Sequence, residues 1–373
     1  MDQKLLKSIG MLVGLTLGAG ILGIPYVFAK AGFFTGLLIL LLLGIVTIII
    51  NLYTAEVTLS TKGIHQLSGY AEKYLGRKGK FLMGLTMIIS AYGAMIAYLL
   101  GIGEAVSTIF NIPSLYVILL FFILLSYAVL RGIRLIEILE LGINCGVITV
   151  LVVIMLLSLR GISLQNFSAF HPSLVFLPFG VILFALAGAA AIPDMRMELD
   201  KDKKKLKKAI ILGTIIPLVL YILFATVIVG VTGTETTAIA TIGLGNTLGS
   251  YMIILGNIFA AFAMATSFLL MALALLWTYN YDYKFKKGLA WALTVFVPLF
   301  IILIGFHDFI EALALTGSIA GGLQGILIVL MHRKAQKNPE RKPEFSIKNN
   351  IVLSSFIIVI YTMGMLYAIY AVF

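Results

Sequence analysis

The chain has 373 residues, of which 61% are hydrophobic and 12% are charged, whereas an average soluble domain carries about 25% charged residues. Apolar runs of membrane-spanning length follow one another almost without pause, which excludes a soluble globular protein and a separate soluble domain. The net charge of +11 falls mostly in short segments between these runs, so it does not indicate nucleic-acid binding.

Hydropathy predicts eleven membrane-spanning helices, at residues 5–28, 33–58, 81–110, 113–130, 135–159, 174–195, 209–231, 249–278, 288–305, 309–331 and 350–373. The first apolar run, of about 20 residues, is too long for a signal peptide, so we interpret it as a retained span. With the N-terminus in the cytoplasm, every Lys and Arg except Lys30 and Arg160 lies on the cytoplasmic side. The charges therefore predict a multi-pass protein of the cell membrane with a cytoplasmic N-terminus and an extracellular C-terminus.

Two of the apolar spans contain a break rich in glycine and alanine, GLTLGAGILGIP at residues 14–25 and FALAGAAAIP at residues 184–193. Both end in Gly-x-x-x-Ile-Pro. Glycine lets the backbone leave helical geometry, and proline removes a hydrogen-bond donor. In lipid such a break is tolerated only where it faces buried protein or a wet cavity.

The two breaks open two halves of five spans each, so the first and sixth spans cross the membrane in opposite directions. This arrangement predicts an all-α protein forming a single transmembrane domain over residues 1–373. Its parts would be two inverted five-helix repeats, 5–159 and 174–331, and an additional helix, 350–373. Matched broken helices of this kind mark the substrate site of a transporter.

The ends of broken helices offer both signs of partial charge without any charged side chain. An amino acid zwitterion suits them, because N–H groups would bind its carboxylate and carbonyl groups its ammonium. The predicted N–H groups for the carboxylate are those of Gly18, Ala19 and Gly20, and the predicted carbonyls for the ammonium are those of Leu15, Thr16, Phe184 and Ala185. Gly188 of the second break completes the predicted substrate-binding residues. Alternatively, glycine and alanine only allow close helix packing. Tyr92 and Phe184 are candidate aromatic gates, although core packing is the default role of a membrane aromatic residue.

Four segments resemble the amino acid/auxin permease family: LGAGILGIPYVFAKAG (17–32), HQLSGYAEKYLG (65–76), FGVILFALAGAAAIPDMRMEL (179–199) and AMATSFLLMALAL (263–275). The nearest branch is that of the prokaryotic hydroxy- and aromatic-amino-acid permeases, within the amino acid–polyamine–organocation superfamily. This resemblance implies a leucine-transporter-like fold and ion-coupled uptake of neutral amino acids. The chain departs from the family at Asp194, where Glu is frequent, and at Ala189 and Ala190, where several members carry a polar residue.

Thr266 and Ser267 are polar residues within an apolar span, which makes them functional candidates. The resemblance implies a sodium site of these two hydroxyls and the backbone oxygens of Gly14, Leu17 and Ala263. Oxygen ligands suit such a hard cation. Alternatively, both hydroxyls bond back to carbonyls of their own helix.

Proton coupling is the rival to sodium coupling. The fifth span has Asn144 and Cys145 but lacks the lysine that replaces the ion in some superfamily members. Four carboxylates near predicted span ends are interpreted as solvated or paired charges: Glu56, Glu104, Glu140 and Glu311. The four histidines fall in or beside predicted loops: His65, His171, His307 and His332. The basic run 196–208 is interpreted as a solvated loop that sets the topology.

The sequence therefore predicts a symporter of neutral, hydrophobic or aromatic L-amino acids, working by alternating access as a monomer in the lipid bilayer. Na⁺ or H⁺ would be the coupling ion, and no other cofactor is expected. A membrane sensor that binds amino acids without transport is the alternative. We do not expect an enzyme, because no nucleophile triad, phosphate loop or paired-carboxylate motif appears.

Overall fold

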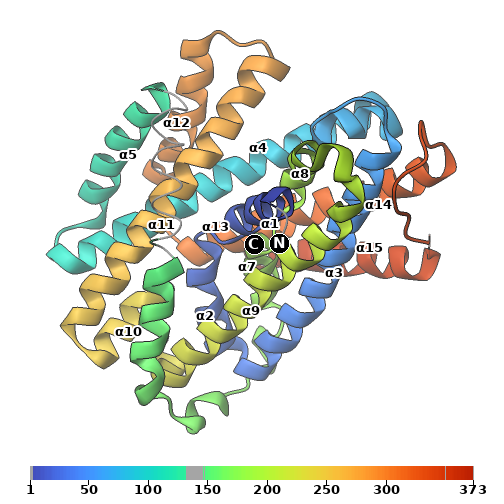
Figure 1. Cartoon of the computed structure of the whole chain (residues 1–373). Coiled ribbons are helices and arrows are strands. Elements are labelled where there is room, and N and C mark those ends of the chain that lie inside the picture. The colour runs from blue at the N-terminus through green and yellow to red at the C-terminus, as the bar shows by residue number, and fades with distance from the viewer. Residues whose placement is uncertain (1–2, 132–145, 147, 349, 373) are drawn as a thin grey trace.

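The computed structural model describes residues 3–131, 146, 148–348 and 350–372 (Figure 1). Every regular element in these residues is a helix, which confirms the predicted all-α class. Among the residues described, eight helices are long and apolar enough to cross a membrane, or nine when one bent pair counts as a span. Shorter apolar helices lie at Ile148–Gly161 and Lys287–Leu303, and the count of eleven spans stays a prediction. Part of the predicted span 135–159, with Glu140, Asn144 and Cys145, lies outside the described residues, as does Phe373.

Both predicted breaks interrupt helices at the expected places. The first half of the chain contains α1 (Gln3–Thr16), α2 (Gly20–Ala31), α3 (Phe33–Ser60), α4 (Leu67–Phe110) and α5 (Ser114–Arg131). The second half contains α7 (Leu177–Ala185), α8 (Ile192–Leu199), α9 (Leu206–Thr232), α10 (Ala240–Leu248), α11 (Ser250–Trp277), α12 (Lys287–Leu303), α13 (Phe309–Leu315), α14 (Gly322–Lys337) and α15 (Ile351–Val372). The bend between α1 and α2 is 55°. The division into inverted repeats remains a prediction.

The broken helices lie in the middle of the molecule. Figure 1 shows α1, α2 and α7 at the centre, with α5 and α12 on one side and α3, α14 and α15 on the other. Helix α1 packs against α8 and α9, and α2 packs against α7 and α9. Both breaks therefore lie among packed helices, and backbone that leaves helical geometry at membrane depth is tolerated where protein or a wet cavity surrounds it.

Arg196 is buried, which corrects its assignment to a solvated loop. The residue belongs to α8, and only 6% of it is exposed. Its guanidinium donates to the carbonyl oxygens of Gly63 at 3.0 Å and Thr61 at 3.2 Å, and to the Tyr70 hydroxyl at 3.0 Å. Arg196 thus connects α8 to the segment that joins α3 to α4. Helix α8 is the second half of a broken span.

Glu56 and His332 are also buried, with 1% and 0% of their surfaces exposed. Glu56 lies in α3, and its carboxylate is paired rather than solvated. His332 lies inside α14, so its assignment to a loop or loop edge is wrong. The structure thus agrees with the paired alternative for Glu56, whereas hydropathy misplaced His332, because a polar residue whose partner satisfies it is tolerated inside a helical bundle.

Candidate functional site

The first break consists of Leu17, Gly18 and Ala19, between the last residue of α1 and the first of α2. The Leu17 N–H donates to the Val13 carbonyl at 2.8 Å, and the Gly18 N–H donates to the Thr16 carbonyl at 2.8 Å. The first bond joins residues four apart and continues α1, whereas the second closes a tight turn. The predicted N–H of Gly18 is therefore already used within the break.

Groups of both signs remain unpaired around this first break. Within the described chain, no N–H donates to the carbonyl groups of Gly14 and Leu15, and the N–H groups of Ala19 and Gly20 find no acceptor. Gly14 and Leu15 are exposed, whereas Ala19 and Gly20 are buried. The carbonyls are at the negative end of α1 and the N–H groups at the positive end of α2.

The second break follows α7 and has the same chemistry. The Leu186 N–H donates to the Ile182 carbonyl at 2.9 Å, and the Ala187 N–H donates to the Phe184 carbonyl at 3.1 Å. In the described residues, the N–H groups of the following Gly188 and Ala189 have no acceptor. Pro193 lies in the first turn of α8, where its missing N–H costs nothing.

Two glycines allow the breaks to approach each other closely. A Cβ atom at Gly20 would lie 2.7 Å from both Cα and Cβ of Ala185. A Cβ atom at Gly188 would lie 2.6 Å from Leu12 Cδ1 and 3.1 Å from Thr16 Oγ1. Both glycines therefore allow close helix packing, which was the alternative interpretation of these residues. It coexists with the unpaired backbone groups.

Tyr221 connects the two breaks, and the sequence analysis missed it. This fully buried residue of α9 places its hydroxyl 2.6 Å from the Thr16 carbonyl oxygen and 2.9 Å from that of Ala185. These carbonyls belong to the last residues of α1 and α7. The predicted ammonium-binding carbonyls of Thr16, Phe184 and Ala185 therefore already accept hydrogen bonds, and that of Leu15 remains free. The available signal was a single tyrosine within an apolar span.

Tyr98 is a second aromatic residue that the sequence analysis missed. Its hydroxyl would lie 3.7 Å from a Cβ atom at Gly18, and Ser267 Oγ would lie 3.4 Å from the same position. The Tyr98 ring also meets the Phe184 ring edge to face, with 6.4 Å between centroids. Residues of α4, α7 and α11 thus gather around the first break.

Tyr92, the predicted gate, is engaged elsewhere. Its hydroxyl lies 2.6 Å from the Tyr279 hydroxyl and donates to the Leu293 carbonyl of α12 at 3.2 Å. Tyr98 is six residues further along the same helix, about 9 Å along its axis. Sequence spacing alone did not distinguish the two tyrosines, because both are aromatic residues of one apolar span.

The residues of the predicted sodium site differ in their surroundings. The Thr266 hydroxyl donates to the carbonyls of Phe262 and Ala263, both at 3.0 Å, so this residue bonds back to its own helix. Ser267 instead lies against the first break at Gly18. A Cβ atom at Gly14 would have no neighbour within 4 Å.

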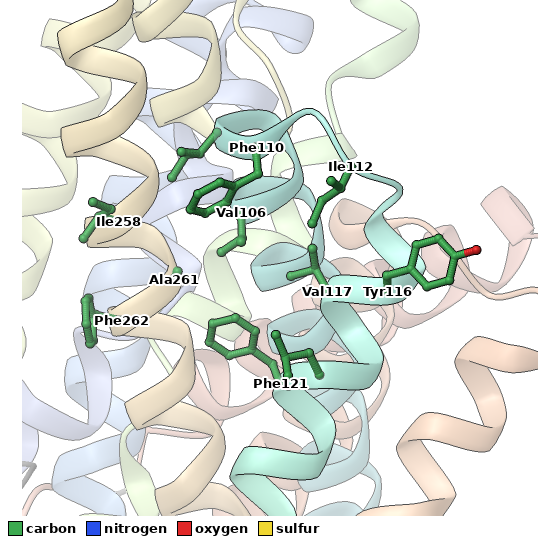
Figure 2. A pocket seen from close by; sticks show the side chains of 11 residues that line it. Val106, Phe110, Ile112, Tyr116, Val117, Phe121, Ile258, Ala261 and Phe262 are labelled. Atoms are coloured by element: carbon green, nitrogen blue, oxygen red, sulfur yellow. The ribbon is translucent and has the colours of Figure 1, made fainter.

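An apolar cavity of about 400 Å³ lies apart from both breaks, between α4, α5 and α11. Figure 2 shows its lining, which includes Val106, Val117, Phe121, Ala261 and Phe262. Neither break contributes a residue to it. The cavity therefore does not belong to the candidate site.

Comparisons with known proteins agree on the class of protein. Glutamine transporter 2 of Aliivibrio fischeri is 28% identical over 334 residues, which are 86% of each chain. Tyrosine-specific transport system 1 of Haemophilus influenzae is 27% identical over 234 residues, 60% of this chain and 56% of that protein. The crystal structure of MhsT in complex with L-phenylalanine shares the fold, with a TM-score of 0.66 and 16% identity over 100% of this chain and 99% of that one.

The relationship extends to a family model. Residues 1–368 match the model of the tryptophan/tyrosine permease family. The predicted relationship to amino acid permeases is therefore confirmed, as is the prediction that the protein is not an enzyme. Because the match spans nearly the whole chain, this protein belongs to the tryptophan/tyrosine permease family.

Proposed function

We propose that this protein carries neutral L-amino acids across the membrane by alternating access and binds them between the two breaks. The observation that carries the proposal is the set of unpaired backbone groups at opposed helix ends. Residues 8–29 and 172–193 contain no Asp, Glu, Lys, Arg or His. The breaks therefore offer backbone N–H and carbonyl groups to the charged ends of a substrate. The names of the relatives in Aliivibrio fischeri and Haemophilus influenzae, which specify glutamine and tyrosine transport, support an amino acid substrate.

The backbone groups suggest how the zwitterion is oriented. Its carboxylate would accept from the N–H groups of Ala19 and Gly20, at the positive end of α2. Its ammonium would donate to the Leu15 carbonyl, at the negative end of α1. We assign Tyr221 to holding the ends of α1 and α7 in register rather than to binding the substrate itself.

The substrate side chain would lie among small and aromatic residues. Ala185 to Ala191 provide small side chains, and Tyr98 with Phe184 provides an aromatic edge. This lining favours hydrophobic or aromatic amino acids. A second charge on the side chain would lack a partner in a low-dielectric site, at a cost of several kcal/mol.

Symport with a cation completes the proposal. Ser267 supports a sodium site that also uses Gly14, Leu17, Ala263 and Thr266, because it lies against the first break. Thr266 would have to release its bonds to Phe262 and Ala263 before it coordinated sodium. Proton coupling is the other form of symport, and sensing without transport is the alternative function.

The test is a binding screen of the twenty amino acids on the purified protein, with and without sodium, followed by uptake of labelled ligand into proteoliposomes. Neutral amino acids should bind, while lysine, arginine, aspartate and glutamate should not. Esterifying the carboxylate or acylating the amine of the best ligand should each weaken binding about tenfold or more, because a charge-assisted bond contributes about 1.5–3 kcal/mol. Tight binding of arginine or glutamate would contradict recognition by backbone. Binding without accumulation in the vesicles would indicate a sensor.

A further inference from the structure

A buried carboxylate lies at the end of α3, away from both breaks. Glu56 accepts from His332 Nε2 and Gln336 Nε2, each at 2.9 Å, and from Ser346 Oγ at 2.6 Å. The backbone N–H of Ile347 donates to it at 2.8 Å. Four donors satisfy both carboxylate oxygens, so the cluster is built to hold Glu56 in its charged form.

His332 is held rigidly beside this carboxylate but uses only one ring nitrogen. The ring stacks on Tyr53, with centroids 3.8 Å apart and planes 8° from parallel. Its Nε2 faces Glu56, while Nδ1 is buried and has no hydrogen-bond partner in the described part of the chain. Buried polar atoms are rarely left unpaired, so this nitrogen requires an explanation.

Because no donor occupies it, that nitrogen is a position at which the ring can take up a proton. When Nε2–H donates to Glu56, the neutral ring presents the Nδ1 lone pair as a base. Protonation there turns the ring into a cation next to the carboxylate, under the face of Tyr53. The pair then changes from a net charge of −1 to a neutral ion pair, the form in which buried charges are best tolerated. We propose that Glu56 and His332 form a proton-binding site, in which Nδ1 of His332 takes the proton.

The site is connected to elements on both sides of α3. The segment of residues 338–348, here called the strap, covers the cluster through Ser346 and Ile347 and is anchored where Glu340 N–H donates to the Ser60 carbonyl at 2.9 Å. Another side of the same helix end, at Ala55 and Leu59, packs in the apolar cluster that contains α8. A proton on His332 would tighten the strap, α3 and α14 around Glu56. Its effect on transport rests on the proposed function.

Three other charged groups of the strap, Glu340, Arg341 and Glu344, form ion pairs, and its remaining charged residues are Lys342 and Lys348. Hydrogen bonds from Lys73 and from the Lys62 N–H hold the pKa of Glu340 below its usual range. Glu340 therefore keeps its charge near pH 6.5, about where a histidine titrates. Arg341 pairs with Glu344 at 2.6 Å. Tyr53, on the same helix as Glu56, faces the histidine ring. Among side chains, a histidine is the one that ordinarily changes its charge near neutral pH, so pH is the variable that tests this cluster.

The direct test is a pH titration of ¹⁵N-histidine-labelled protein by NMR. The chain has four histidines, and the signals that disappear in His332→Gln are those of His332. This substitution keeps the cluster together because glutamine can still donate to Glu56. The pH is lowered from about 8 to about 5, the range in which histidine side chains commonly change charge, and we expect the His332 signals to change from the neutral to the cationic form. In Glu56→Gln, which keeps the shape of the cluster, the cation should appear only at lower pH. His307→Gln, a substitution of an exposed histidine, should leave the His332 titration unchanged. A His332 signal that keeps one form across this range in folded protein would overturn the proposal.

Uptake into proteoliposomes tests the link to transport separately. The uptake rate of the wild type and of His307→Gln should vary with pH over this range, whereas that of His332→Gln should vary at least threefold less. Substrate binding by His332→Gln should persist. If no amino acid accumulates in the vesicles, the proposed transport function is wrong, but the NMR titration still tests the proton-binding site independently. If uptake occurs and His332→Gln keeps the wild-type pH profile, the link between this site and transport is wrong.

Discussion

The substitution Tyr221→Phe tests whether one hydroxyl holds the two breaks together. It removes the donor that lies 2.6 Å from the Thr16 carbonyl and 2.9 Å from the Ala185 carbonyl, while it preserves the buried ring. The Thr16 carbonyl keeps a second donor, the Gly18 N–H at 2.8 Å. The Ala185 carbonyl has no other donor among the described residues, so it would be left unpaired in a site that is almost closed to water.

The expected loss follows from that single unpaired group. A buried acceptor without a donor costs about 1–3 kcal/mol, which corresponds to roughly 5- to 150-fold in an equilibrium constant. The ends of α1 and α7 would lose their shared anchor, and the unpaired groups of the first break would no longer be held in one arrangement. The unfolding equilibrium should therefore shift at least about fivefold toward the unfolded state, so that the protein unfolds at a lower temperature, and substrate affinity should fall because the binding groups are less well ordered.

The assay is ligand binding and thermal unfolding of the purified protein in detergent. Tyr361→Phe is the matched control, because Tyr361 is 2% exposed and its hydroxyl makes no hydrogen bond within the described chain. The control should retain both wild-type affinity and wild-type unfolding temperature. Wild-type values in Tyr221→Phe would show that the hydroxyl does not organise the breaks. An equal loss in the control would trace the effect to the removal of any buried phenol oxygen.

Two further substitutions test the packing around the breaks by the same measurements. Gly20→Ala would place a Cβ atom 2.7 Å from the Ala185 backbone, and overpacking of this kind should destabilise the protein by about 1–3 kcal/mol and weaken binding. The control Gly10→Ala meets nothing within 4 Å and should be neutral or stabilise α1 by up to about 1 kcal/mol. Equal effects of the two substitutions would contradict the close approach of the breaks. Arg196→Gln removes charge-assisted bonds to three acceptors and should destabilise the protein by about 1.5–3 kcal/mol. The control Lys207→Gln changes an exposed residue and should change stability by less than about 0.5 kcal/mol. Unfolding of both variants at the same temperature would refute the role of Arg196.

Features that depend only on the local sequence were predictable. Apolar runs identified the protein as a helical membrane protein, since each run alone is long enough to span the bilayer. Gly20 identified the start of α2, and Gly188 the short turn that precedes α8, because glycine and the proline five residues later constrain the backbone locally. The unpaired groups of Ala19 and Leu15 follow from the break itself, whatever surrounds it.

The residues that act through distant partners were not predictable. Tyr221 bonds to a carbonyl 205 positions away, and His332 bonds to Glu56 across 276 positions. A tyrosine looks the same to hydropathy whether it faces a break, as Tyr98 does, or a neighbouring helix, as Tyr92 does. The sequence by itself determined the helices and the places where they break, because those depend on local backbone chemistry. Only the tertiary structure decided which polar groups are satisfied and by what, because hydrogen bonding depends on atoms that helix packing brings together from remote parts of the chain.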